Sequence, residues 1–304
     1  MKKILPLLPY LLGWGLLLST FSLFEVSLAN GIAQLILFLF VVCIPAWKTQ
    51  RMSYVDIGWP WGLVLIGVMT LLYSEGNWLR VSIVAAAYIF MGLRMGLGAL
   101  KLWKMGYLNE ELPRYKYQHR RWDKAGYTDK RFVMQVEVLL QGLANAAFLA
   151  MPAFVIGSNS GDTLSMFEVA GMLIWLLAFL IESVSDVQKL SFLKSMRSQG
   201  LKNKVCNVGL WRYSRHPNYF AEWMVWNALL IASVPSWLSL QKDEYSVVWL
   251  LLGVALLFVS RIMYVTLVHY TGAKPAEYYS IKKRPEYKQY QQTTNMFFPG
   301  KPKV

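Results

Sequence analysis

Eight apolar stretches, each close to the length of a membrane-spanning helix, alternate with polar connections along the chain. They cover roughly residues 4–24, 32–47, 58–74, 79–100, 133–157, 166–186, 219–239 and 247–268. A helix needs about 20 mainly apolar residues to cross about 30 Å of hydrocarbon. The stretches lack the two-residue alternation of barrel strands, so helices are expected. The pattern predicts an all-α, polytopic membrane helical bundle with seven to eight transmembrane helices.

The first stretch has two interpretations. Lys2 and Lys3, the apolar run and the small residues around Ala29 resemble a signal peptide with its cleavage site. The run is longer than the apolar core of about 7–15 residues that such peptides carry, which favours an uncleaved helix. An uncleaved helix gives eight spans, and cleavage would leave seven.

Basic residues gather in every second connection. Of the 31 Lys and Arg, 27 lie in the N-terminus, in residues 48–57, 101–132 and 187–217, and in the tail from residue 270. Cytoplasmic loops of membrane proteins collect Lys and Arg, so these segments and the C-terminus are predicted to be cytoplasmic. The same loops explain the net charge of +14, so no nucleic-acid partner is expected.

No repeat, flexible linker or low-complexity tract divides the chain. We expect N-terminal transmembrane helices over 1–50 and one membrane domain over 51–304, with cytoplasmic loops at 101–132 and 187–217. Cys43 and Cys206 lack the spacing of metal ligands, and no metal site is expected. Neither G-x-G-x-x-G nor the P-loop motif occurs, which argues against a Rossmann or P-loop nucleotide site.

The densest polar segment, residues 207–222, enters the seventh apolar stretch. Its donors for phosphate or carboxylate are Arg212, Arg215 and His216. Pro217 suits the first position of a helix, where exposed amides favour an anion. A collar of snorkelling basic side chains is the plain alternative. Asn218 and Glu222, carried into the span, favour a binding site.

Acidic side chains at membrane depth mark two further candidate sites. Glu182 and Asp186 lie four residues apart and share a helix face. Because acids in a membrane are costly, they suggest a polar wall that faces a ligand, although pairing with loop arginines is the alternative. Asp56, where the third stretch begins, is either a helix cap or an acid at the mouth of a cavity.

Two basic features leave more than one interpretation open. Arg94 lies near the cytoplasmic end of the fourth stretch, where it can snorkel to the interface. The 101–132 loop interleaves basic and aromatic residues around Arg114 and Tyr115. A nucleotide and an anionic lipid headgroup are equally plausible ligands for that loop.

From Gly209 to Glu222 the sequence resembles the steroid 5-alpha-reductase family, and most closely its bacterial membrane branch. The resemblance covers roughly residues 50–300. Supporting features recur in order: Val55-Asp56-Ile-Gly-Trp59, Gly92-Leu-Arg94, Pro113-Arg114-Tyr115, Gln135 to Gly142, Ile181-Glu182 to Lys189, Arg284-Pro-Glu-Tyr287 and Phe297-Phe-Pro299.

The resemblance implies a helical oxidoreductase of a bacterial inner membrane that acts on a CH–CH group, similar to a 3-oxo-5-alpha-steroid 4-dehydrogenase. NADPH would pass a hydride to the β carbon of an enone-type double bond in a lipid-like substrate. Asn218, Glu222 and Asp186 match the family's cofactor contacts. The full set of implied cofactor-binding residues is Arg114, Tyr115, Glu182, Asp186, Lys189, Arg212, Tyr213, Arg215, His216, Asn218, Tyr219 and Glu222.

Asp56 and Tyr88 are the expected catalytic residues, and Trp59 and Arg94 the expected substrate-binding residues. The eukaryotic reductases place a Glu on an early span to polarise the substrate carbonyl, and Asp56 is the nearest acid here, one methylene shorter. Hydride addition develops negative charge on the carbonyl oxygen, which a neutral acid would stabilise. An apolar site favours that neutral form.

Two other functions are compatible with the same residues. Arg-His-Pro-x-Tyr also occurs in isoprenylcysteine and phospholipid methyltransferases, which bind S-adenosylmethionine and usually add a Glu-Glu pair in the last segment. Here Glu277 stands alone before Tyr278, which favours the reductase. A non-catalytic lipid-binding protein is the third interpretation, but it leaves the deep acids unexplained. The expected partners are a hydrophobic lipid-like substrate and membrane lipids.

Overall fold

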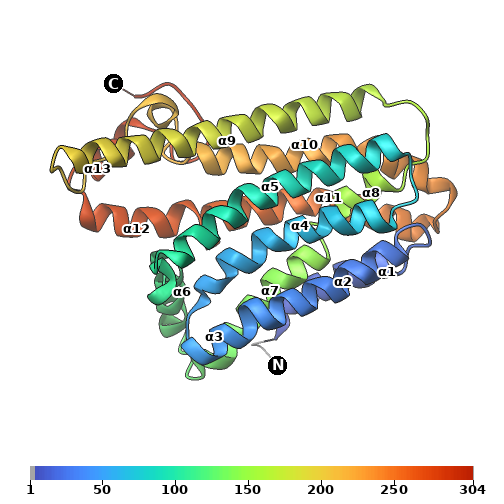
Figure 1. Ribbon diagram of the computed structural model, residues 1–304, viewed down its shortest axis with the longest axis horizontal. Coiled ribbons are helices and arrows are strands. Elements are labelled where there is room, and N and C mark those ends of the chain that lie inside the picture. The colour runs from blue at the N-terminus through green and yellow to red at the C-terminus, as the bar shows by residue number, and fades with distance from the viewer. Residues whose placement is uncertain (1–3, 304) are drawn as a thin grey trace. The chain divides into compact units, whose positions relative to one another are not determined.

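The computed structural model describes residues 4–303, and every regular element in that part of the chain is a helix (Figure 1). The elements in chain order are η1 (Leu5–Leu7), α1 (Leu8–Leu18), α2 (Phe24–Phe38), η2 (Leu39–Cys43), α3 (Ile44–Thr49), η3 (Met52–Tyr54), α4 (Val55–Tyr73), α5 (Trp78–Lys104), η4 (Tyr107–Asn109), α6 (Pro113–Lys124), α7 (Lys130–Ala146), α8 (Met151–Gly157), α9 (Met166–Ser198), η5 (Gly209–Arg212), α10 (Pro217–Ser239), η6 (Leu240–Lys242), α11 (Ser246–Val265), η7 (Thr266–Tyr270), α12 (Ala273–Lys283) and α13 (Tyr287–Thr293).

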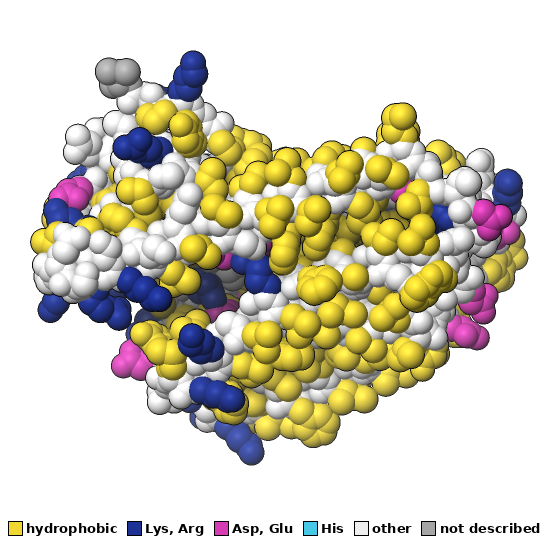
Figure 2. Space-filling model, turned by 45° about the horizontal axis from the view of Figure 1, so that its top comes forward, with side chains coloured by type: hydrophobic (Ala, Val, Ile, Leu, Met, Phe, Trp, Pro, Cys, Tyr) yellow, Lys and Arg dark blue, Asp and Glu magenta, His cyan; other side chains and the backbone are white. Residues whose placement is uncertain are grey.

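Within residues 4–303, seven helical segments are long and apolar enough to cross a membrane. They are Phe24–Thr49, Met52–Tyr73, Trp78–Lys104, Lys130–Gly157, Met166–Ser198, Pro217–Lys242 and Ser246–Lys283. Hydrophobic side chains lie along the helices on the face that Figure 2 shows, and Lys and Arg gather near helix ends. The all-α transmembrane fold is confirmed, and the chain is an integral membrane protein.

The first apolar stretch corrects the expectation of eight full spans. It forms the helix Leu5–Leu18, which is about 20 Å long at 1.5 Å per residue and shorter than the hydrocarbon layer. The chain turns at residues 20–23, and α2 begins at Phe24. Residues 25–31, expected as a connection, are helical and extend the next span.

The contacts between residues divide the chain into two units. Unit 1 comprises Met1–Ala170 and Leu229–Val259, and unit 2 comprises Gly171–Ala228 and Ser260–Val304. The units change after residues 170, 228 and 259, and the expected division at residue 50 stays a prediction. The helices α10 and α11 each contribute residues to both units.

In unit 1, α4 and α5 pack closely because glycine removes side-chain bulk where they meet. A Cβ atom added to Gly92 on α5 would lie 2.6 Å from the Pro60 carbonyl oxygen and 2.7 Å from Cγ2 of Val64 on α4. Membrane helices use small residues in this way because apolar burial gives them little driving force in lipid. The contact therefore depends on the absence of a side chain at Gly92.

Replacing Gly92 with Ala should destabilise the protein by about 1–3 kcal/mol, the usual cost of overpacking a tight contact. Gly98→Ala on the same helix is the matched control, because a Cβ there meets nothing within 4 Å. Alanine is also the better helix former, so Gly98→Ala should be neutral or stabilising by up to about 1 kcal/mol. Detergent unfolding followed by tryptophan fluorescence measures both, and equal effects would contradict the close-contact explanation.

The stretch 133–157, expected as one helix, is interrupted between α7 and α8. Pro152 near the start of α8 lacks an N–H and clashes with the carbonyl four residues earlier, which favours a break here, although α4 and α10 continue through Pro60 and Pro235. The hydroxyl of Tyr88 donates to the carbonyl oxygen of Leu149 at 2.7 Å, within this interruption. Tyr88 thus satisfies a backbone group that lipid would leave unpaired.

The short helix α6 is fixed to the ends of the neighbouring spans in unit 1. Its buried residues Tyr115 and Trp122 belong to the hydrophobic cluster formed with residues of α2, η2, α4 and α7. Just before α6, the Glu111 carboxylate accepts the N–H groups of Met52 at 2.7 Å and Ser53 at 3.1 Å. Burial raises the pKa of Glu111, but its hydrogen bonds outweigh this and lower the pKa overall. The carboxylate therefore stays ionised and caps the start of the span Met52–Tyr73.

In unit 2 the C-terminal segment folds back onto the residues that precede α10. The Arg215 N–H donates to the Asn295 carbonyl at 2.8 Å, and the Gly300 N–H donates to the Tyr213 carbonyl at 2.9 Å. The Phe297 ring packs edge-on against Phe220 with centroids 5.8 Å apart. These contacts hold the basic motif of the sequence in a defined conformation.

Candidate functional site

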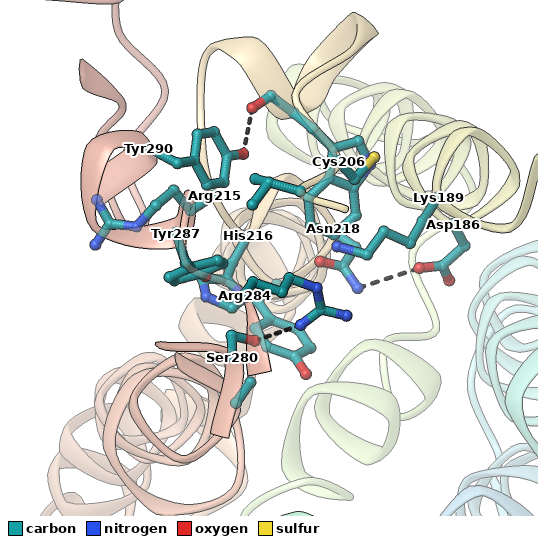
Figure 3. Close-up of a pocket in the computed structure, with 14 residues that line it drawn as sticks. Asp186, Lys189, Cys206, Arg215, His216, Asn218, Ser280, Arg284, Tyr287 and Tyr290 are labelled. Atoms are coloured by element: carbon teal, nitrogen blue, oxygen red, sulfur yellow. Dashed lines mark hydrogen bonds between the residues drawn. The ribbon is translucent and has the colours of Figure 1, made fainter. Parts of the chain in front are cut away.

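A pocket of about 270 Å³ lies in unit 2, among α9, α10, α12, α13 and the segment that leads into α10 (Figure 3). Its lining residues are Asp186, Lys189, Val205, Cys206, Trp211, Arg215, His216, Asn218, Tyr219, Ala276, Ser280, Arg284, Tyr287 and Tyr290. Six of the sequence candidates are therefore brought together: Asp186, Lys189, Arg215, His216, Asn218 and Tyr219.

Arg215 is committed to neighbouring protein groups. Its Nε lies 2.7 Å from Glu277 Oε1 and its Nη2 3.2 Å from Oε2, and both side chains are buried. Its Nη1 donates to the backbone carbonyls of Gln291 and Thr294. Since its charge is balanced and its donors are used, Arg215 acts mainly as a structural centre that ties α10 to α12 and α13.

His216 belongs to the same cluster. Its Nε2 lies 3.2 Å from Glu277 Oε1, and its ring stacks on Tyr219 with centroids 5.2 Å apart. Burial lowers the pKa of His216, although the bond to Glu277 opposes this. The imidazole is therefore neutral at pH 7 and adds no cation to the pocket.

Lys189 and Arg284 supply the positive charge of the pocket. The Lys189 amino group lies 4.0 Å from the centroid of the Trp211 ring. The Arg284 guanidinium donates to Ser280 Oγ at 3.1 Å and to the Lys204 carbonyl at 3.2 Å. Over residues 4–303, neither cation is ion-paired with a carboxylate. Figure 3 shows both head groups directed into the pocket beside Asn218.

Asn218 and Asp186 form a polar pair beside Lys189 in the pocket (Figure 3). Asn218 Nδ2 donates to Asp186 Oδ1 at 3.1 Å. Asn218 Oδ1 is buried and has no hydrogen-bond partner in the described part of the chain. A buried acceptor without a partner is costly, so a ligand N–H or O–H that reached it would be stabilised.

Two phenols and a thiol complete the lining. Burial raises the pKa of Tyr287, Tyr290 and Cys206, so all three stay protonated at pH 7. The Tyr290 hydroxyl donates to the Trp211 carbonyl. These groups add ring surface and hydrogen-bonding capacity, and they add no charge.

Four further candidates of unit 2 lie outside the pocket lining. Arg212 and Tyr213 are exposed, whereas Glu182 and Glu222 are buried. Asp186 lines the pocket, whereas Glu182, about one turn earlier on α9, does not. The expected cofactor contacts of these four residues stay predictions.

Arg114 and Tyr115 contact Asp56 within unit 1. Arg114 forms an ion pair with Asp56 Oδ2, and the Tyr115 hydroxyl donates to Asp56 Oδ1 at 2.6 Å. The sequence analysis assigned this arginine and this tyrosine to the cofactor, but they are not among the residues that line the pocket of unit 2. A neutral Asp56, as the expected mechanism requires, would have to give up its ion pair.

The remaining candidates of unit 1 have more ordinary surroundings. Trp59 is partly buried and packs against the hydrophobic cluster that includes Tyr115 and Trp122. Tyr88 is fully buried, with its hydroxyl bonded to Leu149. Arg94 is half-buried on α5. Their catalytic and substrate-binding roles stay predictions.

A family model described as a protein of unknown function, DUF1295, matches residues 39–294. The chain belongs to the DUF1295 family. No curated protein and no solved structure matches it significantly. The region that matches DUF1295 contains every residue of the pocket and also Asp56, Arg114 and Tyr115. The helices α1 and α2 precede the DUF1295 region.

The sequence analysis missed the part of the pocket that α12, Arg284 and α13 contribute. The available signal was Arg284-Pro285-Glu286-Tyr287, which was recognised only as part of the family resemblance. Cys206 carried no usable signal because an isolated cysteine is most often a buried packing residue.

Proposed function

We propose that this DUF1295 protein is a membrane-embedded, NADPH-dependent reductase that transfers a hydride to an enone-type double bond of a steroid-like or other hydrophobic lipid. One observation carries the proposal. Lys189 and Arg284, neither paired with a carboxylate, face Asn218 and Asp186 in one pocket. This arrangement suits a ligand that combines phosphate groups with hydroxyl and amide groups.

The chemistry of the lining fits parts of NADPH. Lys189 and Arg284 would hold a phosphate by charge-assisted hydrogen bonds. Asp186 would accept ribose hydroxyls, and Asn218 Oδ1 would accept an N–H or O–H. The volume of about 270 Å³ lies near the lower end for small-molecule sites, so the pocket would hold one portion of the dinucleotide. When bound, NADPH would supply the hydride.

Charge favours NADPH over S-adenosylmethionine. S-adenosylmethionine carries a sulfonium cation and no phosphate, so Lys189 and Arg284 would repel its reactive group. Glu277, the acid that matches the methyltransferase position, is bound by Arg215, His216 and Gln291. It is therefore not available to hold a ligand unless this cluster rearranges.

The chain's own part in hydride transfer is electrostatic. Hydride addition to a conjugated alkene leaves negative charge on the carbonyl oxygen, and a preorganised donor there lowers the barrier. We propose Asp56 for this donor, a role that requires its carboxyl group to be released from Arg114. The Tyr115 hydroxyl, 2.6 Å away, would orient the Asp56 carboxyl group.

The basic connections indicate on which side of the membrane the pocket opens. Two segments outside the spans contribute to the pocket, the connection 199–216 and residues 284–303 after the last span, and both are rich in Lys and Arg. By the positive-inside rule these segments are cytoplasmic, where NADPH is available. We therefore infer a bacterial inner membrane with a cytoplasmic C-terminus.

Calorimetric titration of the detergent-purified chain tests the cofactor assignment. NADPH should bind, and S-adenosylmethionine should not. Lys189→Gln and Arg284→Gln should each weaken NADPH binding by about 10–100-fold, because each removes a hydrogen bond to a charged group. Lys202→Gln is the control, since Lys202 is exposed and outside the pocket. Binding of S-adenosylmethionine in preference to NADPH would replace the reductase with the methyltransferase.

A further inference from the structure

The connection between the spans Trp78–Lys104 and Lys130–Gly157 carries a positive charge that the proposed reductase does not use. Residues 101–131 contain nine Lys and Arg but only four Asp and Glu. Some of these charges are balanced locally: Lys116 lies 3.5 Å from Glu110, and Lys130 lies 2.5 Å from Asp123. A surplus of cations remains on this surface of unit 1.

Three lysines belong to this surplus. Lys101, Lys104 and Lys124 are exposed, and in the described part of the chain none is ion-paired with a carboxylate. Lys101 and Lys104 lie in the last turn of α5, and Lys124 ends α6. All three therefore lie at the end of the span Trp78–Lys104 or in the connection that follows it, on one side of the membrane.

Exposed apolar and aromatic side chains accompany these lysines. Trp103 is 50% exposed, Met105 59% and Tyr107 53%. An aromatic and a basic side chain also meet at the end of the span Phe24–Thr49. Trp47 is 49% exposed there, and the Arg131 guanidinium lies 5.8 Å from its ring centroid. Tryptophan and tyrosine at the ends of spans favour the depth of the lipid headgroups. A water-soluble anion would leave these side chains without a partner.

The surface is held rigidly by its buried side. Tyr115 and Trp122 pack into the hydrophobic cluster of unit 1, and Glu111 bonds the N–H groups of Met52 and Ser53. The helix α6 is therefore fixed to the neighbouring spans and is not a free loop. A preorganised set of cations loses less conformational entropy on binding than a flexible one.

We propose that the basic connection that carries Lys101, Lys104 and Lys124, with Trp103 next to Lys104 in the chain, binds the phosphate headgroups of anionic membrane lipids. The ammonium groups would contact the phosphate, and the Trp103 indole would lie among the glycerol and upper acyl groups. The site belongs to unit 1 and does not depend on the proposed reductase.

Native mass spectrometry of the full chain in mixed micelles tests this site. With phosphatidylglycerol and phosphatidylcholine at equal concentration, the wild type should retain phosphatidylglycerol preferentially. The triple variant Lys101→Gln, Lys104→Gln, Lys124→Gln should lose this affinity on the order of 10²-fold, because each basic residue near an anionic headgroup contributes about fivefold. Trp103→Ala should weaken binding while leaving the charge unchanged.

The matched control removes three other exposed lysines, by Lys202→Gln, Lys301→Gln and Lys303→Gln, all of them in unit 2. It carries the same change in net charge and should bind phosphatidylglycerol as the wild type does. Equal loss in both triple variants would show a general charge effect and overturn the proposal. Displacement of the lipid by inorganic phosphate would also overturn it, because the site would then select a soluble anion. If the triple variant does not fold, Lys104→Gln and a salt titration of the wild type give the same comparison.

Discussion

Replacing Asp56 with Asn should lower the turnover of the proposed reductase by about 10²–10³-fold, the usual effect of losing one preorganised donor. Asparagine keeps the volume of the side chain but removes the acid proton. NADPH affinity should stay near that of the wild type, because Asp56 does not line the pocket of unit 2. Stopped-flow oxidation of NADPH with a 3-oxo-4-ene steroid or another enone probe, alongside a cofactor titration, measures both quantities.

Two controls separate chemistry from structure at Asp56. Asp123→Asn makes the same change at an exposed carboxylate on α6 and should leave turnover unchanged. Arg114→Met removes the partner of Asp56 and leaves its carboxyl group in place, so this variant should keep most of the turnover. Full turnover in Asp56→Asn would show that another group polarises the substrate. Equal losses in Asp56→Asn and Arg114→Met would show that only the ion pair matters.

Replacing Glu277 with Gln should destabilise the protein by about 3–5 kcal/mol. The substitution leaves the buried Arg215 guanidinium without its anionic partner, which is the costly way to break a buried ion pair. Glu277 also joins His216 and Gln291, so the loss affects α10, α12 and α13 together. Unfolding in a denaturing detergent, followed by tryptophan fluorescence, gives the difference in stability.

Glu286→Gln is the matched control for Glu277, because it makes the same change in the same unit. Glu286 pairs with Lys204 at 2.6 Å, but both side chains are well exposed, so its loss should cost less than about 1 kcal/mol. The double variant Arg215→Met with Glu277→Leu should recover part of the stability, because no buried charge remains unpaired. A Glu277→Gln protein as stable as the wild type would contradict the role of this cluster as a structural centre.

The membrane fold was largely predictable because lipid restricts the choice of backbone structure. A segment in hydrocarbon must satisfy its own N–H and C=O groups, so apolar length alone indicates a helix. The same reasoning overestimated the first stretch, since hydropathy does not report where the chain turns. Residues 4–24 are mainly apolar, yet α1 ends at Leu18, next to the polar pair Ser19-Thr20, and the chain reverses before Phe24.

The interruption of the helix near Pro152 could not be predicted from hydropathy. Residues 133–157 are mainly apolar and were expected as one helix, but the span is interrupted between α7 and α8, close to Pro152. At this interruption the Leu149 carbonyl oxygen accepts a hydrogen bond from the Tyr88 hydroxyl. The sequence could not predict this hydrogen bond, because Tyr88 and Leu149 lie 61 positions apart and meet only when the helices pack.

By itself, the sequence determined the parts of the candidate site whose residues lie close together along the chain. Asp186 and Lys189 lie within one helical turn, and Arg215, His216 and Asn218 follow one another, so short spacing was enough to group each set. Only the tertiary structure decided the role of each charge. Glu277 lies 62 positions from Arg215 and still balances it, while Arg284 and Lys189 remain free of carboxylate partners in the described chain. Pairing between distant residues depends on how helices pack, and side-chain type and spacing do not encode that packing directly.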